Sequence, residues 1–388
     1  MISSLGLRLL FCLVLSLPSL TVCAEDWLND YAEYVQAKAQ KQNVPGYLFA
    51  FVEKGKPAKV VSYGKTKRLG NAIDQDAVFR LASVSKTFTA MLVAKLVEKN
   101  RLDWRTSIST LAPEYGFTQA GADRLNLKHL IGESSGFTPN AYDNLIEANY
   151  PIKRVLNMLA DLEPLCAPGQ CYTYQNALFG VLAEYFDEQH SSYAQELQRE
   201  VLSPLGMTTA SVGSAALRSA DKWAKPHVAI AKRTWRDVKV REDYYRYSPA
   251  AGVNASSKDM ILWLRAMLGE MPQVISPQLI EKVTTPQVLT KRELYRKGWR
   301  KYLKSAHYGL GWRIYDFEGH KLNYHGGWVR GYRADIAFAP DQQVAYVMLM
   351  NAESNLINEF TAEFWHRYFE EYKATQNLPQ LASINEPE

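Results

Sequence analysis

Three short motifs in this sequence combine residue types that could carry out acyl transfer. The first contains Ser83 and Lys86, which are three residues apart. At the start of a helix this spacing puts both side chains on one face, with the amine beside the hydroxyl. A neutral or proton-sharing amine can take the serine proton, and backbone N–H groups at the helix start can hold an oxyanion. The pattern therefore predicts Ser83 as a nucleophile and Lys86 as its base.

The same Ser-x-x-Lys pattern occurs twice more, at residues 62–65 and 219–222. The first copy ends a predicted strand before a polar loop, and the second lies in a polar segment with no apolar stripe after it. Ser83 instead follows the strand-like residues 78–82 and opens an amphipathic helix. A simple helix N-cap is the other interpretation of Ser83, and the motif alone leaves both open.

The second motif is Tyr174-Gln175-Asn176, in which the phenol could act as a base and proton shuttle while the Asn176 amide holds a substrate carbonyl. Residues 142–144 repeat its spacing. Tyr174 is favoured because a turn bounded by two cysteines precedes it and an apolar helical run follows it. A packed tyrosine beside a helix-capping asparagine is the alternative interpretation.

The third motif is His325-Gly326-Gly327, which precedes a predicted strand. Glycines beside a strand edge let a substrate backbone approach closely, and an imidazole offers a proton donor or polarising group near neutral pH. Residues 307–309 form a similar His-x-Gly copy. Taken singly, each of the three motifs also has a purely structural explanation.

In their order along the chain, these motifs and several other segments resemble the landmarks of the serine β-lactamase-like family. That family includes class C β-lactamases, penicillin-binding proteins, D,D-peptidases, D-aminopeptidases and related esterases. The resemblance spans roughly residues 27–370 and rests on residues 81–88, 127–137, 167–169, 174–176, 202–207, 249–252, 308–312 and 325–327. It implies the β-lactamase/transpeptidase-like fold and an acyl-enzyme mechanism with no metal or organic cofactor.

The resemblance also implies roles for individual residues. They are Ser83 as the attacking group, Lys86 and Tyr174 for proton transfer, Asn176 for substrate orientation, His325 in place of the lysine of class C β-lactamases, Gly327 to keep the strand edge open, and the backbone N–H groups of Ser83 and Trp328 as the oxyanion hole.

Two departures from the family pattern bear on the substrate. A class C β-lactamase would carry Lys-Thr-Gly at 325–327, where cation and hydroxyl help hold the antibiotic's carboxylate, so strong antibiotic hydrolysis is not expected here. Arg330 could replace the missing charge, although an exposed loop arginine can also be merely solvated. Residues 133–136 differ from the usual threonine and histidine run, which we expect to reshape the pocket rim.

The N-terminus predicts export. One arginine, an apolar run over residues 9–20 and small residues before Glu25 describe a signal peptide cut after Ala24, while lipidation of Cys23 is the alternative. Beyond this segment Cys166 and Cys171 remain, separated by a Pro-Gly turn, and we expect them to form a disulfide because neither has zinc-like partners. The expected location is periplasmic or secreted.

A basic stretch at residues 291–304 carries seven lysines and arginines interleaved with aromatic residues. A solvated face with its aromatic side chains turned inward is the favoured interpretation, over a nucleic-acid or membrane site. The chain of 388 residues has a formal net charge of only +5. We therefore expect small-molecule or peptide substrates such as cell-wall fragments, no nucleic acid, and at most peripheral membrane contact.

The periodicity predicts an α+β fold. We expect helices at 27–42 and 357–372 and strands at 47–52, 58–63, 333–338 and 343–350. One antiparallel sheet built from both chain ends, flanked by the terminal helices, would then carry an inserted, mainly helical subdomain at about 84–300. The predicted organisation is a signal peptide at 1–24, one catalytic domain at 25–372, and a polar, disordered tail at 373–388.

The leading functional hypothesis is an exported serine hydrolase that forms an acyl-enzyme on Ser83. Its substrate would be a peptide of cell-wall or D-amino-acid type, or a small ester. The alternatives are β-lactam hydrolysis as the main activity, or a non-catalytic sensor that binds cell-wall fragments in the same cleft. A third alternative makes the basic stretch the functional surface.

Overall fold

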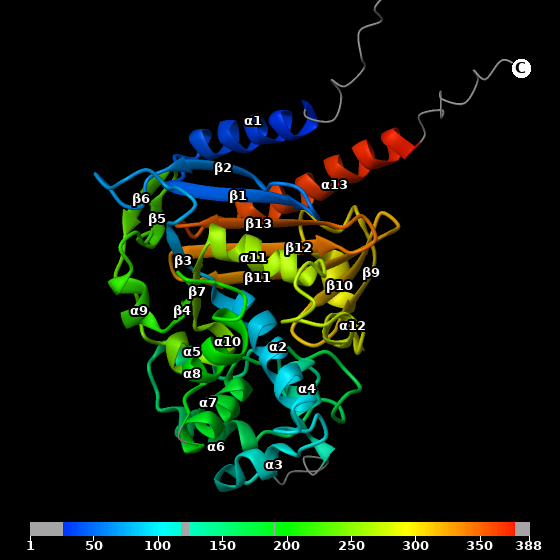
Figure 1. Cartoon of the computed structure of the whole chain (residues 1–388). Coiled ribbons are helices and arrows are strands. Elements are labelled where there is room, and N and C mark those ends of the chain that lie inside the picture. Colours follow the sequence, from blue (N-terminus) through cyan, green and yellow to red (C-terminus); the bar gives the residue numbers. More distant parts are fainter. Residues whose placement is uncertain (1–25, 118–123, 190, 377–388) are drawn as a thin grey trace, which may run out of the picture.

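The computed structural model describes residues 26–117, 124–189 and 191–376. A large antiparallel sheet with the two terminal helices on its outer face forms one half of the molecule (Figure 1). A mostly helical region below it forms the other half. The predicted α+β class is confirmed. The predicted signal peptide lies outside the described residues.

The helices and strands follow one another along the whole described chain. The α-helices are α1 (Asp26–Lys41), α2 (Ser85–Glu98), α3 (Ile108–Leu111), α4 (Leu127–Ile131), α5 (Asp143–Glu147), α6 (Ile152–Ala160), α7 (Gly180–Glu188), α8 (Tyr193–Leu197), α9 (Ser214–Ser219), α10 (Ser248–Ala251), α11 (Ser257–Met267), α12 (Pro277–Thr284) and α13 (Leu356–Gln376). The strands are β1 (Gly46–Glu53), β2 (Lys59–Gly64), β3 (Val78–Arg80), β4 (Ser211–Val212), β5 (His227–Ala231), β6 (Thr234–Asp237), β7 (Val253–Ser256), β8 (Val288–Leu289), β9 (Leu303–Tyr308), β10 (Arg313–Phe317), β11 (His320–Val329), β12 (Tyr332–Ala339) and β13 (Val344–Met350).

The main sheet has eight strands in the order β2-β1-β13-β12-β11-β10-β9-β8. The N-terminal strand β1 pairs antiparallel with the C-terminal strand β13, from Tyr47 opposite Met350 to Glu53 opposite Val344. Both faces of β12 and β13 are buried, which explains why these strands have near-continuous apolar sequences. The prediction that the two chain ends build one sheet is therefore confirmed.

Aromatic side chains fasten α1 and α13 to the outer face of this sheet. Phe364 of α13 stacks on Tyr346 of β13 with ring centroids 4.1 Å apart, and it also contacts Tyr31 of α1 at 5.2 Å. The Tyr31 and Tyr346 hydroxyls hydrogen-bond at 2.7 Å, so the two buried phenols satisfy each other. These contacts belong to a hydrophobic cluster between the terminal helices and the outer face of the sheet. This cluster is separate from the larger one on the other side of the sheet.

The opposite face of the sheet supports the inserted region. Helix α11 packs on β1 and β13, and α2 runs away from the sheet into the helical region (Figure 1). The insertion also contributes β4 and β7 to a small sheet of order β3-β7-β4, and it contains the hairpin β5-β6. The prediction of a mainly helical insertion did not include these strands. Helix α13 extends to Gln376, so the predicted start of the tail at residue 373 was wrong, and residues 377–388 lie outside the described part.

Cys166 and Cys171 form the predicted disulfide, which closes the turn before the Tyr174 segment. No helix in the described residues is both long enough and apolar enough to span a bilayer.

Truncation of the buried ring in Phe364→Ala should lower the free energy of unfolding by about 3–5 kcal/mol, because it leaves a cavity between α13 and β13. Urea denaturation would measure the change. Gln376→Ala, at the exposed end of the same helix, should stay within about 0.5 kcal/mol of the parent. Equal stability of the two variants would contradict this account of the outer layer.

Candidate active site

Ser83 lies on a strained turn between the small sheet and α2. Strand β3 leads through Leu81 into a 3-10 turn, Ala82–Val84, and α2 follows directly. Ala82 adopts φ +50°, a left-handed conformation that costs a non-glycine residue roughly 1–2 kcal/mol. The bond from the Leu81 N–H to the Val253 carbonyl, at 3.0 Å, and complete burial of Ala82 hold the turn in place. Ser83 is left half-buried in the wall of a cavity.

Gly327 brings strand β11 directly against this turn. A Cβ atom at Gly327 would lie 2.1 Å from the Leu81 carbonyl oxygen and 3.2 Å from the Ala82 Cβ. Such a contact is impossible without displacing the backbone, so only glycine fits. Within the described chain β10 pairs with β11 only as far as Tyr324, which leaves residues 325–329 with an open edge towards the cavity. Gly327 thus allows the close packing of strand and turn. Its role in keeping the strand edge open for a substrate stays a prediction.

Lys86 is completely buried one helical turn after Ser83. Its Nζ donates to Asn176 Oδ1 at 2.6 Å and lies 3.5 Å from the Ala250 carbonyl oxygen. The amine also lies 4.6 Å from the centre of the Tyr174 ring. The structure therefore brings Ser83, Lys86, Tyr174 and Asn176 together, as the motifs predicted.

Asn176 connects Lys86 to a buried carboxyl group. Its Nδ2 donates to Asp143 Oδ2 at 2.9 Å while its Oδ1 accepts from Lys86, so the amide orientation is fixed from both sides. Burial raises the pKa of Asp143 to about 6, against the opposing effect of the Asn176 hydrogen bond. Asp143 belongs to the second Tyr-x-Asn copy, which had been set aside in favour of Tyr174. That copy contributes its central residue to the site.

These side chains line a cavity of about 870 Å³ between the helical region and the open edge of β11. Ser83, Tyr174 and Asn176 form one wall, and Gly326, Gly327 and Trp328 face them. The rest of the lining includes ten charged residues: Asp143, Glu147, Arg241, Asp243, Glu293, Arg296, Arg313, Arg330, Arg333 and Glu353. Trp328 is 61% exposed and donates from its indole to Glu353 at 2.7 Å.

His325 is fully buried and is absent from the cavity lining. Its Nδ1 lies 3.0 Å from the Gly326 carbonyl, which can only accept, so Nδ1 carries the proton and Nε2 is the acceptor. Tyr308 OH at 3.1 Å and Arg313 Nη1 at 3.4 Å approach that acceptor. Burial, together with the nearby Arg313 cation, holds the pKa of His325 well below its usual range. A neutral imidazole beneath the cavity does not fit the expected proton donor near neutral pH.

Arg313 supplies a cation in the cavity that sequence reasoning missed. Its guanidinium contacts Glu293 Oε1 at 3.4 Å and His325 Nε2 at 3.4 Å, and it lies 5.3 Å from the centre of the Tyr174 ring. The carboxylate and the neutral imidazole together hold the guanidinium against the phenol. The only signal in the sequence is its place directly after the Tyr308–Trp312 landmark.

Arg330 and Arg333 flank the far end of the open edge. Arg330 is exposed and has no ion pair or hydrogen bond with any described residue. Arg333 is only 7% exposed, donates to Asn355 Oδ1 at 3.0 Å, and keeps a buried Nε with no partner in the described part of the chain. Two cations without an acidic partner therefore face one end of the cavity.

The other candidate segments behave differently. Ser62 and Ser219 are exposed and have no buried lysine beside them. The residues at 133–136 were expected at the pocket rim, but Glu133 is buried beneath the site. In the basic stretch Trp299 and Tyr302 are buried, as expected, but the expected inward orientation is wrong for Tyr295, which is 79% exposed. Arg296 lies in the cavity wall.

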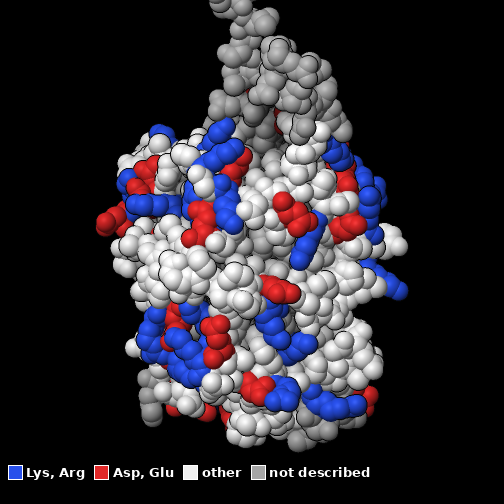
Figure 2. Space-filling view, turned by 45° about the vertical axis from the view of Figure 1, so that its right-hand side comes forward, with Lys and Arg blue, Asp and Glu red and all other residues white. Residues whose placement is uncertain are grey.

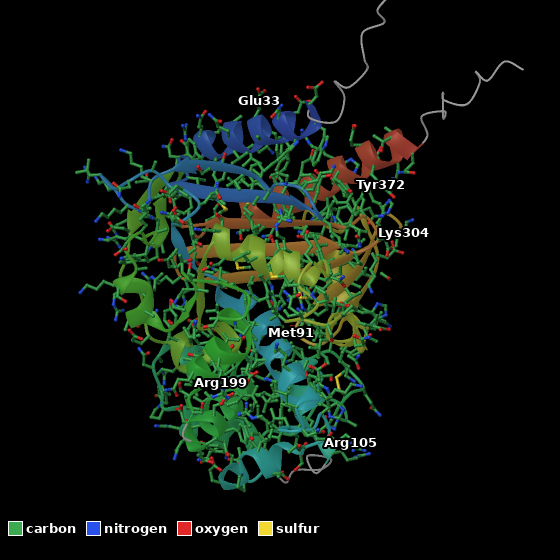
Figure 3. All side chains as sticks on the ribbon, in the orientation of Figure 1. Glu33, Met91, Arg105, Arg199, Lys304 and Tyr372 are labelled. Carbon is green, nitrogen blue, oxygen red and sulfur yellow. A yellow bond between two sulfur atoms is a disulfide. The ribbon has the colours of Figure 1, made fainter. Side chains whose placement is uncertain are left out.

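The surface charges of the stretch are not segregated. Lys304 is an exposed residue of β9 (Figure 3), and its basic neighbours on this stretch are mostly exposed. On the face shown in Figure 2, blue and red side chains are interspersed, with no single-sign field. This pattern agrees with a solvated face rather than a nucleic-acid surface.

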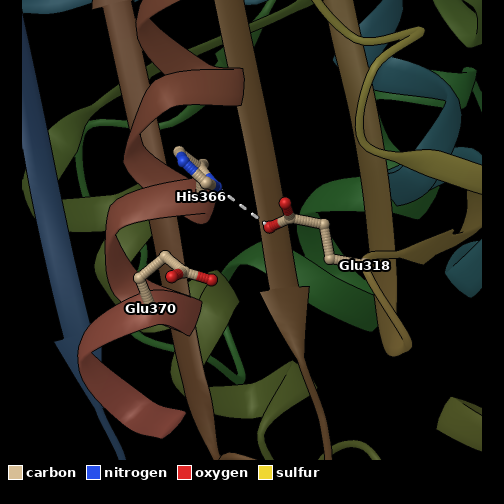
Figure 4. Close-up of side chains that lie close together, drawn as sticks. All are labelled: Glu318, His366 and Glu370. Carbon is tan, nitrogen blue, oxygen red and sulfur yellow. Dashed lines mark hydrogen bonds and ion pairs between the residues drawn. The ribbon is translucent and has the colours of Figure 1, made fainter. Parts of the chain in front are cut away.

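One cluster on the outer layer has metal-ligand chemistry. Glu318, His366 and Glu370 bring three ligand atoms within 4.8 Å of one another (Figure 4). His366 Nδ1 lies 3.1 Å from Glu318 Oε2, and Glu370 accepts from Lys373 at 3.0 Å. The cluster lies at α13, on the opposite face of the sheet from Ser83, so it has no part in the cavity.

The fold and the grouping of Ser83, Lys86, Tyr174 and Asn176 define the β-lactamase-like class of serine hydrolases. Residues 31–363 match the Beta-lactamase family, and the chain belongs to that family. Among curated proteins it is 20% identical over 351 residues to the unguisins hydrolase ungD' of Aspergillus campestris. The match covers 87% of this chain and 64% of that relative, so the chain spans less than two thirds of the relative's length.

Two solved structures show the same fold. The octameric penicillin-binding protein homologue from Pyrococcus abyssi is similar with a TM-score of 0.72 and 20% identity, over 84% of this chain and 73% of that one. The D-amino acid amidase from Ochrobactrum anthropi SV3, complexed with L-phenylalanine amide, has a TM-score of 0.71 and 17% identity, over 90% and 99% of the two chains.

Gly327→Ala should slow covalent labelling of Ser83 by a fluorophosphonate at least about 10-fold, because the new methyl group must push the Leu81 carbonyl and the turn that carries Ser83 away from β11. Time-resolved intact-protein mass spectrometry would measure the rate. Lys321→Ala, at an exposed position of the same strand, is the control. A labelling rate equal to that of the parent would show that the close packing does not position Ser83.

Proposed function

We propose that this protein is an exported serine hydrolase that forms an acyl-enzyme on Ser83. The observation that carries the proposal is the buried Lys86 amine, one helical turn from Ser83 and hydrogen-bonded to Asn176 at 2.6 Å. Burying a lysine costs several kcal/mol unless its partners compensate. A serine with a purely structural role does not require a buried amine beside it, so the pair favours a chemical role. The disulfide agrees with export, because disulfides persist mainly in oxidising compartments.

The chemistry requires two proton transfers in each half of the cycle. As Ser83 Oγ bonds to the substrate carbonyl carbon, its proton moves to the Lys86 amine, and the carbonyl oxygen becomes an oxyanion. The N–H groups of Ser83 and Trp328 donate hydrogen bonds to that oxyanion. Tyr174 relays the proton from Lys86 to the leaving group as the bond between the carbonyl carbon and the leaving group breaks. Water then attacks the acyl-enzyme by the reverse sequence and restores Ser83.

The substrate class follows from the charges in the cavity. We propose amides or esters with a free carboxylate, such as peptides of cell-wall or D-amino-acid type. Arg330 and Arg333, which form no ion pair with a described residue, support this choice. Arginine binds carboxylates through paired N–H donors. Because Arg313 supplies a cation close to the position of the class C lysine, β-lactam hydrolysis is the second candidate activity.

A fluorophosphonate should label the parent protein at Ser83 and should not label Ser83→Ala. Ser62→Ala and Ser219→Ala remove the serines of the other two Ser-x-x-Lys copies and should be labelled like the parent, which makes them matched controls. Intact-protein mass spectrometry followed by peptide mapping would identify the site.

A fluorescent penicillin tested beside the phosphonate separates the candidate activities. A stable adduct would favour a D-alanyl-peptide substrate, and rapid release would favour β-lactam hydrolysis. Absence of any adduct on folded parent protein would contradict the enzyme proposal and favour a sensor that binds cell-wall fragments.

Arg330→Ala should lower kcat/KM about 5-fold for an ester that carries a carboxylate and leave the matching neutral ester unchanged, because an exposed charge pair contributes up to about 1 kcal/mol. Steady-state kinetics with both esters would measure the difference. Arg300→Ala, which removes an exposed charge of the basic stretch, is the control. Equal losses on both esters would exclude carboxylate binding by Arg330.

A further inference from the structure

Glu133 is a buried carboxyl group that the proposed mechanism does not use. It is 1% exposed and adopts φ +50°, a conformation that is uncommon for a residue with a long side chain. It follows α4 and precedes the glycine turn that packs against the disulfide loop. A strained, buried acid beside a proposed catalytic lysine is a candidate for a functional role.

The backbone and the side chain of Glu133 hold the segment that carries Tyr174. The Thr173 N–H donates to the Glu133 carbonyl oxygen at 2.7 Å. The Gln175 N–H donates to Glu133 Oε2, also at 2.7 Å. Glu133 therefore accepts hydrogen bonds from the residues immediately before and immediately after Tyr174. These two bonds constrain the position of the Tyr174 phenol in the cavity.

The second carboxyl oxygen of Glu133 faces Lys86. Oε1 lies 4.0 Å from Lys86 Nζ and has no hydrogen-bond partner among the described residues. It is the only carboxylate oxygen of the described chain within that distance of Lys86. The 4.0 Å separation is too long for a hydrogen bond, yet close enough for strong electrostatic coupling in a dry site.

We propose that Glu133 is a positioning residue for the proposed reaction, which holds Tyr174 through the bonds on both sides of it and controls proton release from Lys86 through the charge on its free oxygen. This inference rests on the proposed function. When Glu133 is neutral, it does not oppose loss of the Lys86 proton. When it is ionised, its negative charge stabilises the ammonium form, which cannot accept the Ser83 proton.

The surroundings of Glu133 determine when it ionises. Burial raises the pKa of Glu133 to about 8, while the Lys86 cation and the Gln175 N–H act in the opposite direction. The titratable and charged groups that face it from the packed elements are Lys86 on α2, Asp143 on α5, Tyr172 and Tyr174 on the segment after the disulfide, Tyr308 on β9 and Arg313 on β10. Glu133 is therefore mostly neutral below about pH 8 and carries its charge above that pH.

The test compares Glu133→Gln with Glu133→Ala across pH 6 to 10, with fluorophosphonate labelling of Ser83 as the readout. The glutamine keeps an acceptor for the Gln175 N–H but cannot ionise. It should label at the parent rate near pH 6.5 and at least about 3-fold faster near pH 9.5. The alanine removes the acceptor and should label more slowly at every pH. Glu188→Gln, an exposed acid, is the control and should follow the parent profile.

A parent-like pH profile for Glu133→Gln would overturn the charge role, and a parent-like rate for Glu133→Ala would overturn the positioning role. Carboxyl ¹³C NMR of Glu133, assigned by its loss in Glu133→Gln, gives a readout that needs no chemistry at Ser83. Lys86→Met should move the Glu133 titration to higher pH, because the cation that lowers its pKa is gone. If Lys86→Met shows that shift but the parent protein is not labelled at Ser83, the proposed function alone is rejected. If the parent is labelled but Lys86→Met shows no shift, this inference is rejected.

Discussion

The buried amine of Lys86 is the constraint around which the rest of the site is organised. A charged or hydrogen-bonding amine with no water contact needs polar partners, and the chain supplies them from three separate segments: Asn176 at 2.6 Å, the Ala250 carbonyl at 3.5 Å and Glu133 at 4.0 Å. Each partner must be brought to one point beneath Ser83. The helical insertion can be understood as the scaffold that does so.

The sheet reaches the same point through a contact of a different kind. Gly327 packs on the Leu81 carbonyl with no room for a side chain, so the sheet built from both chain ends is joined to the turn that carries Ser83. The aromatic layer under α1 and α13 stabilises that sheet from its outer face. The packing of the terminal helices therefore supports, through the sheet, the turn that carries Ser83.

The sequence allowed prediction of the fold and of the residues brought together at Ser83, because apolar periodicity and short motifs are local signals. It did not allow prediction of Arg313, Asp143 or Glu133, since these act through contacts between segments far apart in the chain. From its residue type alone, His325 was expected to act as a proton donor or polarising group near neutral pH. Complete burial next to Arg313 makes that imidazole a neutral hydrogen-bond acceptor, and only the packed structure contains this information.

The central claim is that turnover proceeds through an ester on Ser83. The most direct measurement is rapid acid quenching during hydrolysis of an activated acetate ester, followed by peptide mapping by mass spectrometry. An acetyl group should appear on the peptide that contains Ser83 before steady-state release of acetate begins. Hydrolysis that continues with no acetylated peptide, or with the acetyl group on another residue, would contradict it.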